Sequence, residues 1–597
     1  MRLFRIQIKS FRNFRDVTCR LGKHVVLLGE NGAGKSNFLY ALRLLLDPAL
    51  PDTDRYLDED DFWDGGPSFA GSEVLVSVDL TEYEDEPGVL ACLADHEVDR
   101  PAGWSHSVAR LTYRYGPRDT IEEAKRPSTT KDDYDFAIYG RDDPSNVVSR
   151  EVRRFLGFRV LNALRDAESD LRAWKRSPLR PLLESVRDKL DAKALDKVAK
   201  EVDKATESIA AEPPLMQLRS EIGERLNLML GRQHDIAPTF GFNSTAPRQL
   251  VQSLQLFMDA KRRRRVSDTS LGLANVLYLS LLILHTEQQE NSQVTAATIL
   301  GIEEPEAHLH PQMQRVVFRD LLRSKRSILV STHSPNIASV APVESLVILR
   351  AVGNESQMAS FADATGFSVE ERADLERYLD VTRAEIVFGR GIILVEGDAE
   401  RFVIPAAAGL LPTPVALDEF GISVCSVAGT DFAPYAKLLK TLGIPFVVVT
   451  DGDVRDDTAA SPPGIERGIR ILDAIGDRAS AASIADAKAD KASAALARAG
   501  IFVGSRTLET DLVTKGAGPR LKAAFKALFP GSREATLGRF DTTGAVTDAL
   551  ENAIISLAER AGKGRLAQAF AARMSADDVP EYIRAAIEAI VKKCCRV

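Results

Sequence analysis

The chain has 597 residues, of which 45% are hydrophobic and 27% charged; this is ordinary globular composition, and the length predicts at least two domains. The net charge of −8 argues against a surface that binds nucleic acid over its whole area. Any contact with DNA therefore has to come from local basic clusters. No apolar run is long enough to span a bilayer, and the N-terminus lacks a signal-peptide core, so no membrane contact is expected. The five cysteines show no metal-site or redox spacing, which favours a reducing, cytoplasmic setting.

The first informative stretch is an apolar run, Val25–Leu28, that leads into a loop of the form G-x-x-x-x-G-K-S and then a helical pattern. Glycines let backbone N–H groups turn toward a phosphate without Cβ clashes. Lys35 can reach the β- and γ-phosphates, and the Ser36 hydroxyl can ligate Mg²⁺. Strand, loop and helix in this order favour an ATP site over a glycine-rich turn. The residues expected to hold the nucleotide are Gly29, Asn31, Gly32, Gly34, Lys35 and Ser36.

A second set of residues completes this site. A buried strand predicted over Ala296–Ile302 ends in the acidic pair Glu303 and Glu304, and acids at the carboxyl end of such a strand are typical of nucleotide sites. Glu303 can hold the Mg²⁺ shell, while Glu304 can position or deprotonate the attacking water. A further strand, Ser327–Val330, leads to His333, which is placed to sense the γ-phosphate. On its own, His333 is more often a satisfied histidine at a strand end.

The region between these motifs contains predicted strands and then helices. Three alternating segments predict strands of an antiparallel sheet, and a fourth apolar run predicts another core strand; the four are Ser72–Tyr83, Val108–Tyr115, Tyr134–Tyr139 and Val160–Leu164. From Arg165 to Leu230 the pattern is helical and heavily charged. It favours either an exposed arm for dimerisation or a simple helical subdomain, and the residues alone leave both open.

A basic run, Lys261–Arg265, follows a helix candidate over Pro247–Lys261 and is the strongest local positive charge in the chain. A solvated loop is the usual explanation of such a run, and contact with DNA phosphates is the more specific alternative.

The last third begins with a predicted linker, Gly353–Phe367, and a helix over Ser368–Leu379. The strand Gly391–Val395 then leads to two acids one helical turn apart, and the strand Ile444–Thr450 leads to two aspartates. Two acidic clusters at the carboxyl edge of one parallel sheet predict a divalent-metal site. The four acids are Glu396, Glu400, Asp451 and Asp453.

Four segments resemble the Walker A, signature, Walker B and H-loop of ABC-type ATPases; they are Gly29–Ser36, Ser270–Asn275, Glu303–Pro311 and Ser331–Pro335. The opening Lys9–Phe14 is similar to the recombination and structural-maintenance branch. The resemblance implies that two heads meet, each signature helix capping the partner's nucleotide, hence a homodimer or a higher even oligomer. Glu303 stands where that family usually has Asp, and Asn275 where Gln is common.

The E-G-x-x-E and D-x-D clusters resemble the Toprim fold, and an ATPase joined to a C-terminal Toprim domain resembles the OLD (overcoming lysogenization defect) nucleases. That resemblance adds Glu509 as a further metal ligand and Lys563 as a catalytic cation, with Ala399 replacing the family's usual Thr. It implies a DNA endonuclease that binds and hydrolyses ATP, uses Mg²⁺, Mn²⁺ or another divalent ion, acts in phage defence or DNA processing, and in some members has a helicase partner.

The expected fold is therefore α/β: an ABC-type ATPase head with a helical dimerisation insert, followed by a Toprim domain with a parallel sheet. We expect the ATPase parts at residues 1–164 and 241–380, the insert at 165–240 and the Toprim domain at 381–597. One alternative is an ATP-gated DNA-binding or loading protein with a structural Toprim domain. A topoisomerase-like enzyme is disfavoured because no DNA-gate segment with a nucleophilic tyrosine accompanies the Toprim half.

Overall fold

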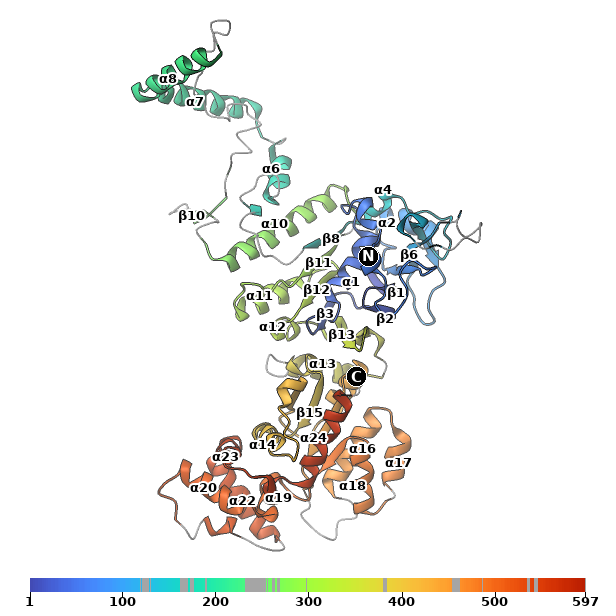
Figure 1. Cartoon of the computed structure of the whole chain (residues 1–597), viewed down its shortest axis with the longest axis vertical. Helices are drawn as coiled ribbons and strands as arrows, with labels where there is room; N and C mark the ends of the chain where they lie inside the picture. The colour runs from blue at the N-terminus through green and yellow to red at the C-terminus, as the bar shows by residue number, and fades with distance from the viewer. Residues whose placement is uncertain are drawn as a thin grey trace. The chain divides into compact units, whose positions relative to one another are not determined.

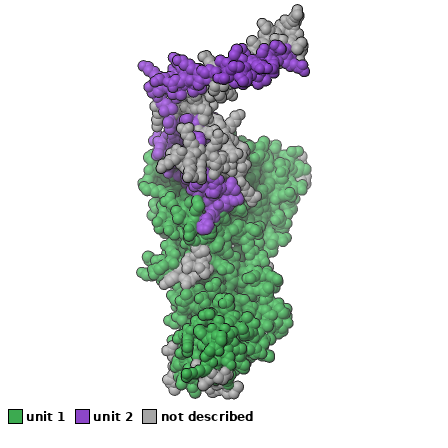
Figure 2. Space-filling model, turned by 90° about the vertical axis from the view of Figure 1, so that its left-hand side faces the viewer, with its two compact units in different colours: residues 1–162, 297–306, 311–597 green, residues 163–296, 307–310 purple. Residues whose placement is uncertain are grey.

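A computed structural model of the chain divides into two compact units, coloured green and purple in Figure 2. The first comprises residues 1–162, 297–306 and 311–597, and the second comprises residues 163–296 and 307–310. The structure describes residues 1–118, 120, 128, 130–161, 170–171, 177–187, 190–230, 254, 256–259, 264–265, 269–296, 298–364, 366–379, 384–453, 462–485, 487–533, 537–541 and 546–595. The boundaries of the four predicted segments stay a prediction.

The phosphate loop lies on a six-stranded sheet of the first unit, in the order β14-β13-β3-β12-β11-β8. Its strands are β3 (Val25–Gly29), β8 (Phe158–Leu161), β11 (Ile299–Glu303), β12 (Ile328–Thr332), β13 (Leu346–Val352) and β14 (Glu355–Ser360). All neighbours are parallel except β13 and β14. Because β3, β11 and β12 run side by side, the loops that follow them meet at one edge of the sheet. The helices beside it are α1 (Lys35–Leu46), α11 (Pro311–Leu321), α12 (Pro335–Ala338) and α13 (Val369–Tyr378).

The prediction of a linker over Gly353–Phe367 is wrong for Glu355–Ser360, which forms β14 in register with β13. This edge strand is polar and lacks apolar alternation, so nothing in its local pattern separates it from a loop. The helix predicted next, Ser368–Leu379, is confirmed as α13 with a capping box at Ser368.

The predicted antiparallel sheet is confirmed in the same unit, with order β2-β1-β4-β6-β5 and β7 beside β6. Its strands are β1 (Arg2–Phe11), β2 (Phe14–Arg20), β4 (Val74–Thr81), β5 (Glu97–Val98), β6 (Val108–Pro117) and β7 (Tyr134–Gly140). Short helices α2 (Pro87–Leu93) and α4 (Arg150–Leu156) accompany them. Tyr113, Tyr115 and Tyr134 are fully buried here, so one face of the sheet packs as an aromatic core.

The second unit contains the predicted charged helices as α6 (Leu179–Arg187), α7 (Ala192–Ala210) and α8 (Pro213–Leu230), together with α10 (Leu271–Asn291). The helix predicted over Pro247–Lys261 is wrong at Phe257–Asp259, which forms strand β9 and pairs with β10 (Arg264–Arg265). The other residues of that candidate, apart from 254 and 256, lie outside the described residues, as do positions 261–263 of the basic run. The antiparallel pairing of these two short strands overrides the weak helical pattern.

The C-terminal part of the first unit is built on a fully parallel sheet in the order β16-β15-β17-β18, shown in the lower half of Figure 1. Its strands are β15 (Gly391–Val395), β16 (Ile422–Ser426), β17 (Phe446–Thr450) and β18 (Ile501–Val503). Because β15 lies between β16 and β17, the strand order reverses beside it, where ligands bind in open α/β sheets.

The helices of this part flank that sheet or follow it. They are α14 (Asp398–Gly409), α15 (Ala433–Thr441), α16 (Pro463–Ala474), α17 (Arg478–Ala485), α18 (Ala489–Arg498), α19 (Leu508–Leu512), α20 (Gly518–Leu528), α22 (Asp548–Ala561), α23 (Lys563–Ala571) and α24 (Glu581–Cys594). No described helix combines the length and the apolar character needed to cross a membrane.

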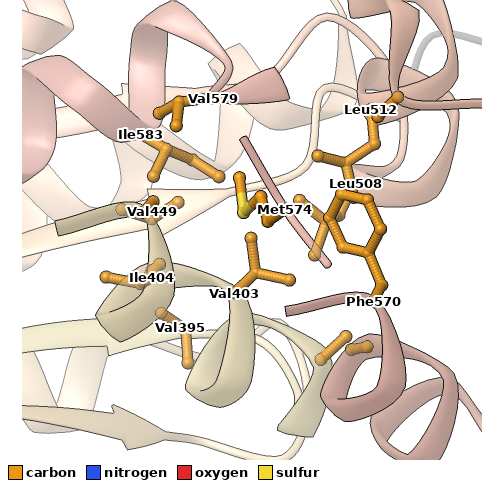
Figure 3. Close-up of a cluster of buried hydrophobic side chains, with 14 of the residues drawn as sticks. Val395, Val403, Ile404, Val449, Leu508, Leu512, Phe570, Met574, Val579 and Ile583 are labelled. Carbon is orange, nitrogen blue, oxygen red and sulfur yellow. The ribbon is translucent and has the colours of Figure 1, made fainter. Parts of the chain in front are cut away.

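A buried apolar cluster includes residues of the strands that lead to the acidic clusters of this sheet. Figure 3 shows Val395, Val403, Val449 and Leu508 in this cluster, and each is at most 2% exposed. Val395 directly precedes Glu396 and Leu508 directly precedes Glu509, so the packed core fixes the backbone from which these carboxylates extend.

Candidate active site

The phosphate loop has the backbone that its glycines predict. Gly34 caps α1 with a φ of 96°, and a Cβ there would lie 2.1 Å from the side-chain nitrogen of Asn13. Lys35 is buried, and its Nζ donates to the carbonyls of Gly29 and Glu30 at 2.9 Å each. Burial lowers the pKa of Lys35 to about 8, against the attraction of nearby acids, of which Glu304 is the strongest. The loop therefore holds a cation whose hydrogen bonds go to its own backbone.

The acids predicted to complete this site lie beside the loop. The Ser36 hydroxyl donates to Oε1 of Glu303, so the two predicted Mg²⁺ ligands are in contact. Glu304 has a left-handed backbone with a φ of 44°, and its N–H donates to the Ser331 carbonyl at 2.9 Å. Such a conformation costs about 1–3 kcal/mol and is characteristic of functional positions. A hydroxyl and a carboxylate are hard oxygen ligands, which fit Mg²⁺.

Glu306 is a residue of this site that the sequence reasoning missed. Its Oε1 accepts a 2.7 Å hydrogen bond from the backbone N–H of His333, and its Oε2 is buried without a hydrogen-bond partner among the described residues. Burial, with help from the positive charge of Lys35, lowers the pKa of His333, so its imidazole is neutral at pH 7. The run Glu303-Glu304-Pro305-Glu306 offered the signal, because a third acid follows the pair within three residues.

The signature segment belongs to the second unit. The Ser270 hydroxyl accepts from the N–H of Leu273 and caps α10, and the Asn275 side chain donates to the Ala307 carbonyl at 3.0 Å. A Cβ at Gly272 would lie 2.5 Å from the His308 carbonyl oxygen, which explains the glycine at this position.

In the C-terminal part, Glu396 and Asp453 are joined by one arginine. Oε1 of Glu396 accepts from the Asp451 N–H at 2.9 Å and from Nη1 of Arg467 at 2.6 Å. Nη2 of the same guanidinium donates to Oδ2 of Asp453 at 2.6 Å. Arg467 lies on α16 and its side chain is 7% exposed. Sequence reasoning missed it, and no local pattern marks it.

Of the remaining acids of this edge, Glu400 is buried and Asp451 is half-buried. The pKa of Glu400 is raised to about 7 by burial and then by the charges of Glu509 and Glu396. Burial also raises the pKa of Asp451 well above its ordinary value, with Glu400 the strongest of the neighbouring charges that add to it. Buried carboxylates that destabilise one another favour a bound cation or a proton.

Glu509 and Lys563 approach this edge from two helices. Glu509 is buried on α19, the helix that follows β18. Lys563 is the first residue of α23, and its Nζ lies 4.0 Å from Oε1 of Glu509. A Cβ at Gly564 would lie 3.1 Å from the Cβ of Asp398, so the start of α23 packs closely on α14.

The five carboxylates are oxygen ligands of the kind that a divalent cation prefers, although they are not arranged around a common point in this structure. Within the described ranges, no three His, Cys, Asp or Glu side chains are spaced to hold a metal ion as they stand. The acids nevertheless lie near enough to raise one another's pKa. The two observations agree because Arg467 pairs with two of the five carboxylates, Glu396 and Asp453, and so keeps them from grouping around an ion. The ligand assignment stays a prediction.

Comparisons with known proteins match both parts of the chain. Residues 25–339 match the family model described as "AAA domain, putative AbiEii toxin, Type IV TA system". Residues 387–453 match the model "Overcoming lysogenization defect protein-like, TOPRIM domain". The chain is 25% identical to the OLD nuclease of Thermus scotoductus, over 76% of this chain and 82% of that protein. It is 22% identical to the endonuclease GajA of Bacillus cereus, over 76% and 75%. The solved C-terminal region of the Burkholderia pseudomallei OLD protein is 38% identical, covering 35% of this chain and 99% of that one, with a TM-score of 0.30.

The fold and the two matches define an AAA-type ATPase joined to a C-terminal Toprim domain. The ATPase model spans more than half of the chain, so the chain belongs to that ATPase family, and through its Toprim part it belongs to the OLD proteins.

Proposed function

We propose that this protein is an ATP-hydrolysing, divalent-metal-dependent DNA endonuclease that nicks and cleaves DNA at its Toprim edge. The observation that carries the proposal is the cluster of carboxylates at the switch point of the parallel sheet, where burial raises the pKa of Glu400 and of Asp451. Relatives named OLD nuclease and endonuclease GajA support the assignment. Phage defence or DNA processing is the biological role that we infer for it.

The nuclease chemistry is assigned to residues on five different elements. Divalent ions bound here supply an activated water and positive charge on the scissile phosphate. Lys563 is 43% exposed, so its ammonium group can reach a phosphate from solvent while staying near Glu509. The residues that would hold the ions are Glu396, Glu400, Asp451, Asp453 and Glu509.

The ATPase chemistry is assigned to the other parallel sheet. Lys35 exchanges its two carbonyl partners for phosphate oxygens when nucleotide enters the loop. Ser36 and Glu303 hold Mg²⁺, Glu304 positions the attacking water, and His333 donates toward the γ-phosphate. Since ATPases of this type work in pairs, we propose a homodimer or a higher even oligomer.

The test follows nicking of supercoiled plasmid and phosphate release from ATP in the same preparations, with Mg²⁺ and with Mn²⁺. Asp451→Ala should lose nicking and keep ATP hydrolysis, because its carboxylate belongs to the Toprim edge alone. Asp398→Asn is the matched control, since that side chain is 70% exposed on α14, and it should keep both activities. Wild-type nicking by Asp451→Ala would overturn the nuclease assignment and favour the alternative, an ATP-gated DNA-binding protein.

A further inference from the structure

The guanidinium of Arg467 occupies a position that the proposed function does not account for. It is buried between two carboxylates that follow different strands, Glu396 after β15 and Asp453 after β17, and donates to each at 2.6 Å. The same Nη1 also donates to the Asp451 carbonyl at 3.2 Å. It donates to the Thr450 hydroxyl as well, while its Nε is buried without a hydrogen-bond partner among the described residues. The ionic partners of the guanidinium are therefore the two acids.

Charge divides the five predicted ligands into two groups. Glu396 and Asp453 have a fixed cation between them. In the described part of the chain, no ion pair from a basic side chain reaches Glu400 or Asp451, and Glu509 has only the ammonium of Lys563 at 4.0 Å. Burying a guanidinium carries a desolvation cost that only close pairing offsets. The arginine therefore neutralises one side of the cluster and leaves the other side open to a cation.

We propose that Arg467 is a positioning residue that acts as a built-in counter-cation: it holds Glu396 and Asp453 together in the metal-free protein, and a divalent ion must displace it to bind them. The inference rests on the proposed function, because it concerns the same carboxylates. Its consequence is that the two sides bind ions unequally. The side with Glu400, Asp451 and Glu509 binds first, and the side with Arg467 binds more weakly because the ion competes with a guanidinium for the same oxygens.

The test is Mn²⁺ binding, followed by the electron paramagnetic resonance signal of free Mn²⁺ in titrations of the full-length protein without DNA or ATP. Wild type should show a tighter and a weaker class of site. In Arg467→Met, which removes the charge and keeps much of the length, the weaker class should tighten at least tenfold. Arg467→Lys should tighten it severalfold, because a single ammonium cannot span both carboxylates. Arg470→Met, on the exposed face of the same helix, should leave both classes unchanged.

A second readout is thermal unfolding in EDTA and in Mn²⁺. Without metal, Arg467→Met should melt below wild type, because two carboxylates lose their counter-charge, and saturating Mn²⁺ should restore its melting temperature. If Arg467→Met does not fold without metal, the Lys variant alone decides the question.

Unchanged or weaker Mn²⁺ affinity of the second class in these variants, or a loss of melting temperature that is equal with and without Mn²⁺, would overturn the inference and leave Arg467 a purely structural residue. Failure of wild type to bind Mn²⁺ at all would instead overturn the metal site of the proposed function, and the inference with it.

Discussion

Replacing Glu400 by Gln should stabilise the metal-free protein at alkaline pH while abolishing DNA cleavage. Burial raises the pKa of this carboxyl from 4.5 to about 7, and each pKa unit corresponds to about 1.4 kcal/mol. Keeping the carboxylate charged in the folded protein therefore costs about 3 kcal/mol at pH 8 relative to a neutral side chain. Gln removes the charge with nearly the same volume, so the variant escapes that cost.

The sign of the effect depends on pH. The pKa of Glu400 is higher in the folded protein than in the unfolded chain, so the folded state holds the proton more tightly. The stability gained from that proton is fully present below about pH 4.5 and is lost as pH rises through 7. The advantage of Glu400→Gln over wild type should accordingly be about 3 kcal/mol at pH 8 and about 1 kcal/mol at pH 5.

The assay is differential scanning calorimetry in EDTA, reading the unfolding transition that shifts when Mn²⁺ is added to wild type. For a domain of 150–250 residues, 1 kcal/mol corresponds to about 2–4 °C, so the gain at pH 8 should be roughly 6–12 °C. Mn²⁺ should raise this transition in wild type much more than in the variant. Asp398→Asn, an exposed acid on the same helix, should show neither effect. A variant that melts below wild type at pH 8, or gains equally at both pH values, would refute the electrostatic reasoning.

Four further outcomes are expected. Lys35→Ala should abolish ATP hydrolysis, because the loop loses its cation on the γ-phosphate, whereas Glu304→Gln should bind ATP and turn it over slowly; phosphate release and nucleotide binding measure both. Lys563→Ala should lower plasmid nicking with Mn²⁺ binding retained, since it contributes charge on the phosphate rather than a ligand. Light scattering at micromolar protein should give a dimer mass or a higher even multiple, and a monomer with and without ATP would contradict the pairing of heads. If Lys261–Arg265 touches DNA phosphates, neutralising it should weaken binding to all sequences and flatten the salt dependence by about one unit of slope per lost contact; an unchanged slope would assign the run to solvent.

The parts of the fold that could be predicted are those in which the chain carries its own signal locally. The phosphate loop was predictable because strand, glycine loop and helix follow one another within Val25–Leu46. The acids after β15 and β17 were predictable because each follows a continuous apolar run buried on both faces. The polar edge strand Glu355–Ser360 was not predictable, because its strand conformation comes from pairing with β13 rather than from its side chains.

The parts of the site that could not be predicted depend on distance along the chain. Arg467 follows Glu396 by 71 residues and lies on an amphipathic helix whose sequence pattern is typical of any surface helix. Glu509 has no strand-end position to mark it, since it lies on the five-residue helix α19. Its placement near the acidic edge became available only through resemblance to a family. Glu306 lay within reach of sequence reasoning as a third acid after the pair Glu303 and Glu304, but its role depends on the hydrogen bond that it accepts from the N–H of His333.

The two predicted centres share an architecture and have opposite electrostatic character. Both lie at the carboxyl edge of a parallel sheet, yet the phosphate loop holds Lys35, whose hydrogen bonds go to two backbone carbonyls. A buried cation held by neutral carbonyls is suited to an anion, which is what a nucleotide phosphate provides. At the Toprim edge the groups without an ion pair among the described residues are the carboxylates of Glu400 and Asp451. Burial raises the pKa of both, and the neighbouring carboxylates add to the shift, so they are suited to cations. The two folds alone do not distinguish the two kinds of site. The sign of the charge at the sheet edge does: a lysine cation favours a phosphorylated ligand, and carboxylates favour metal ions.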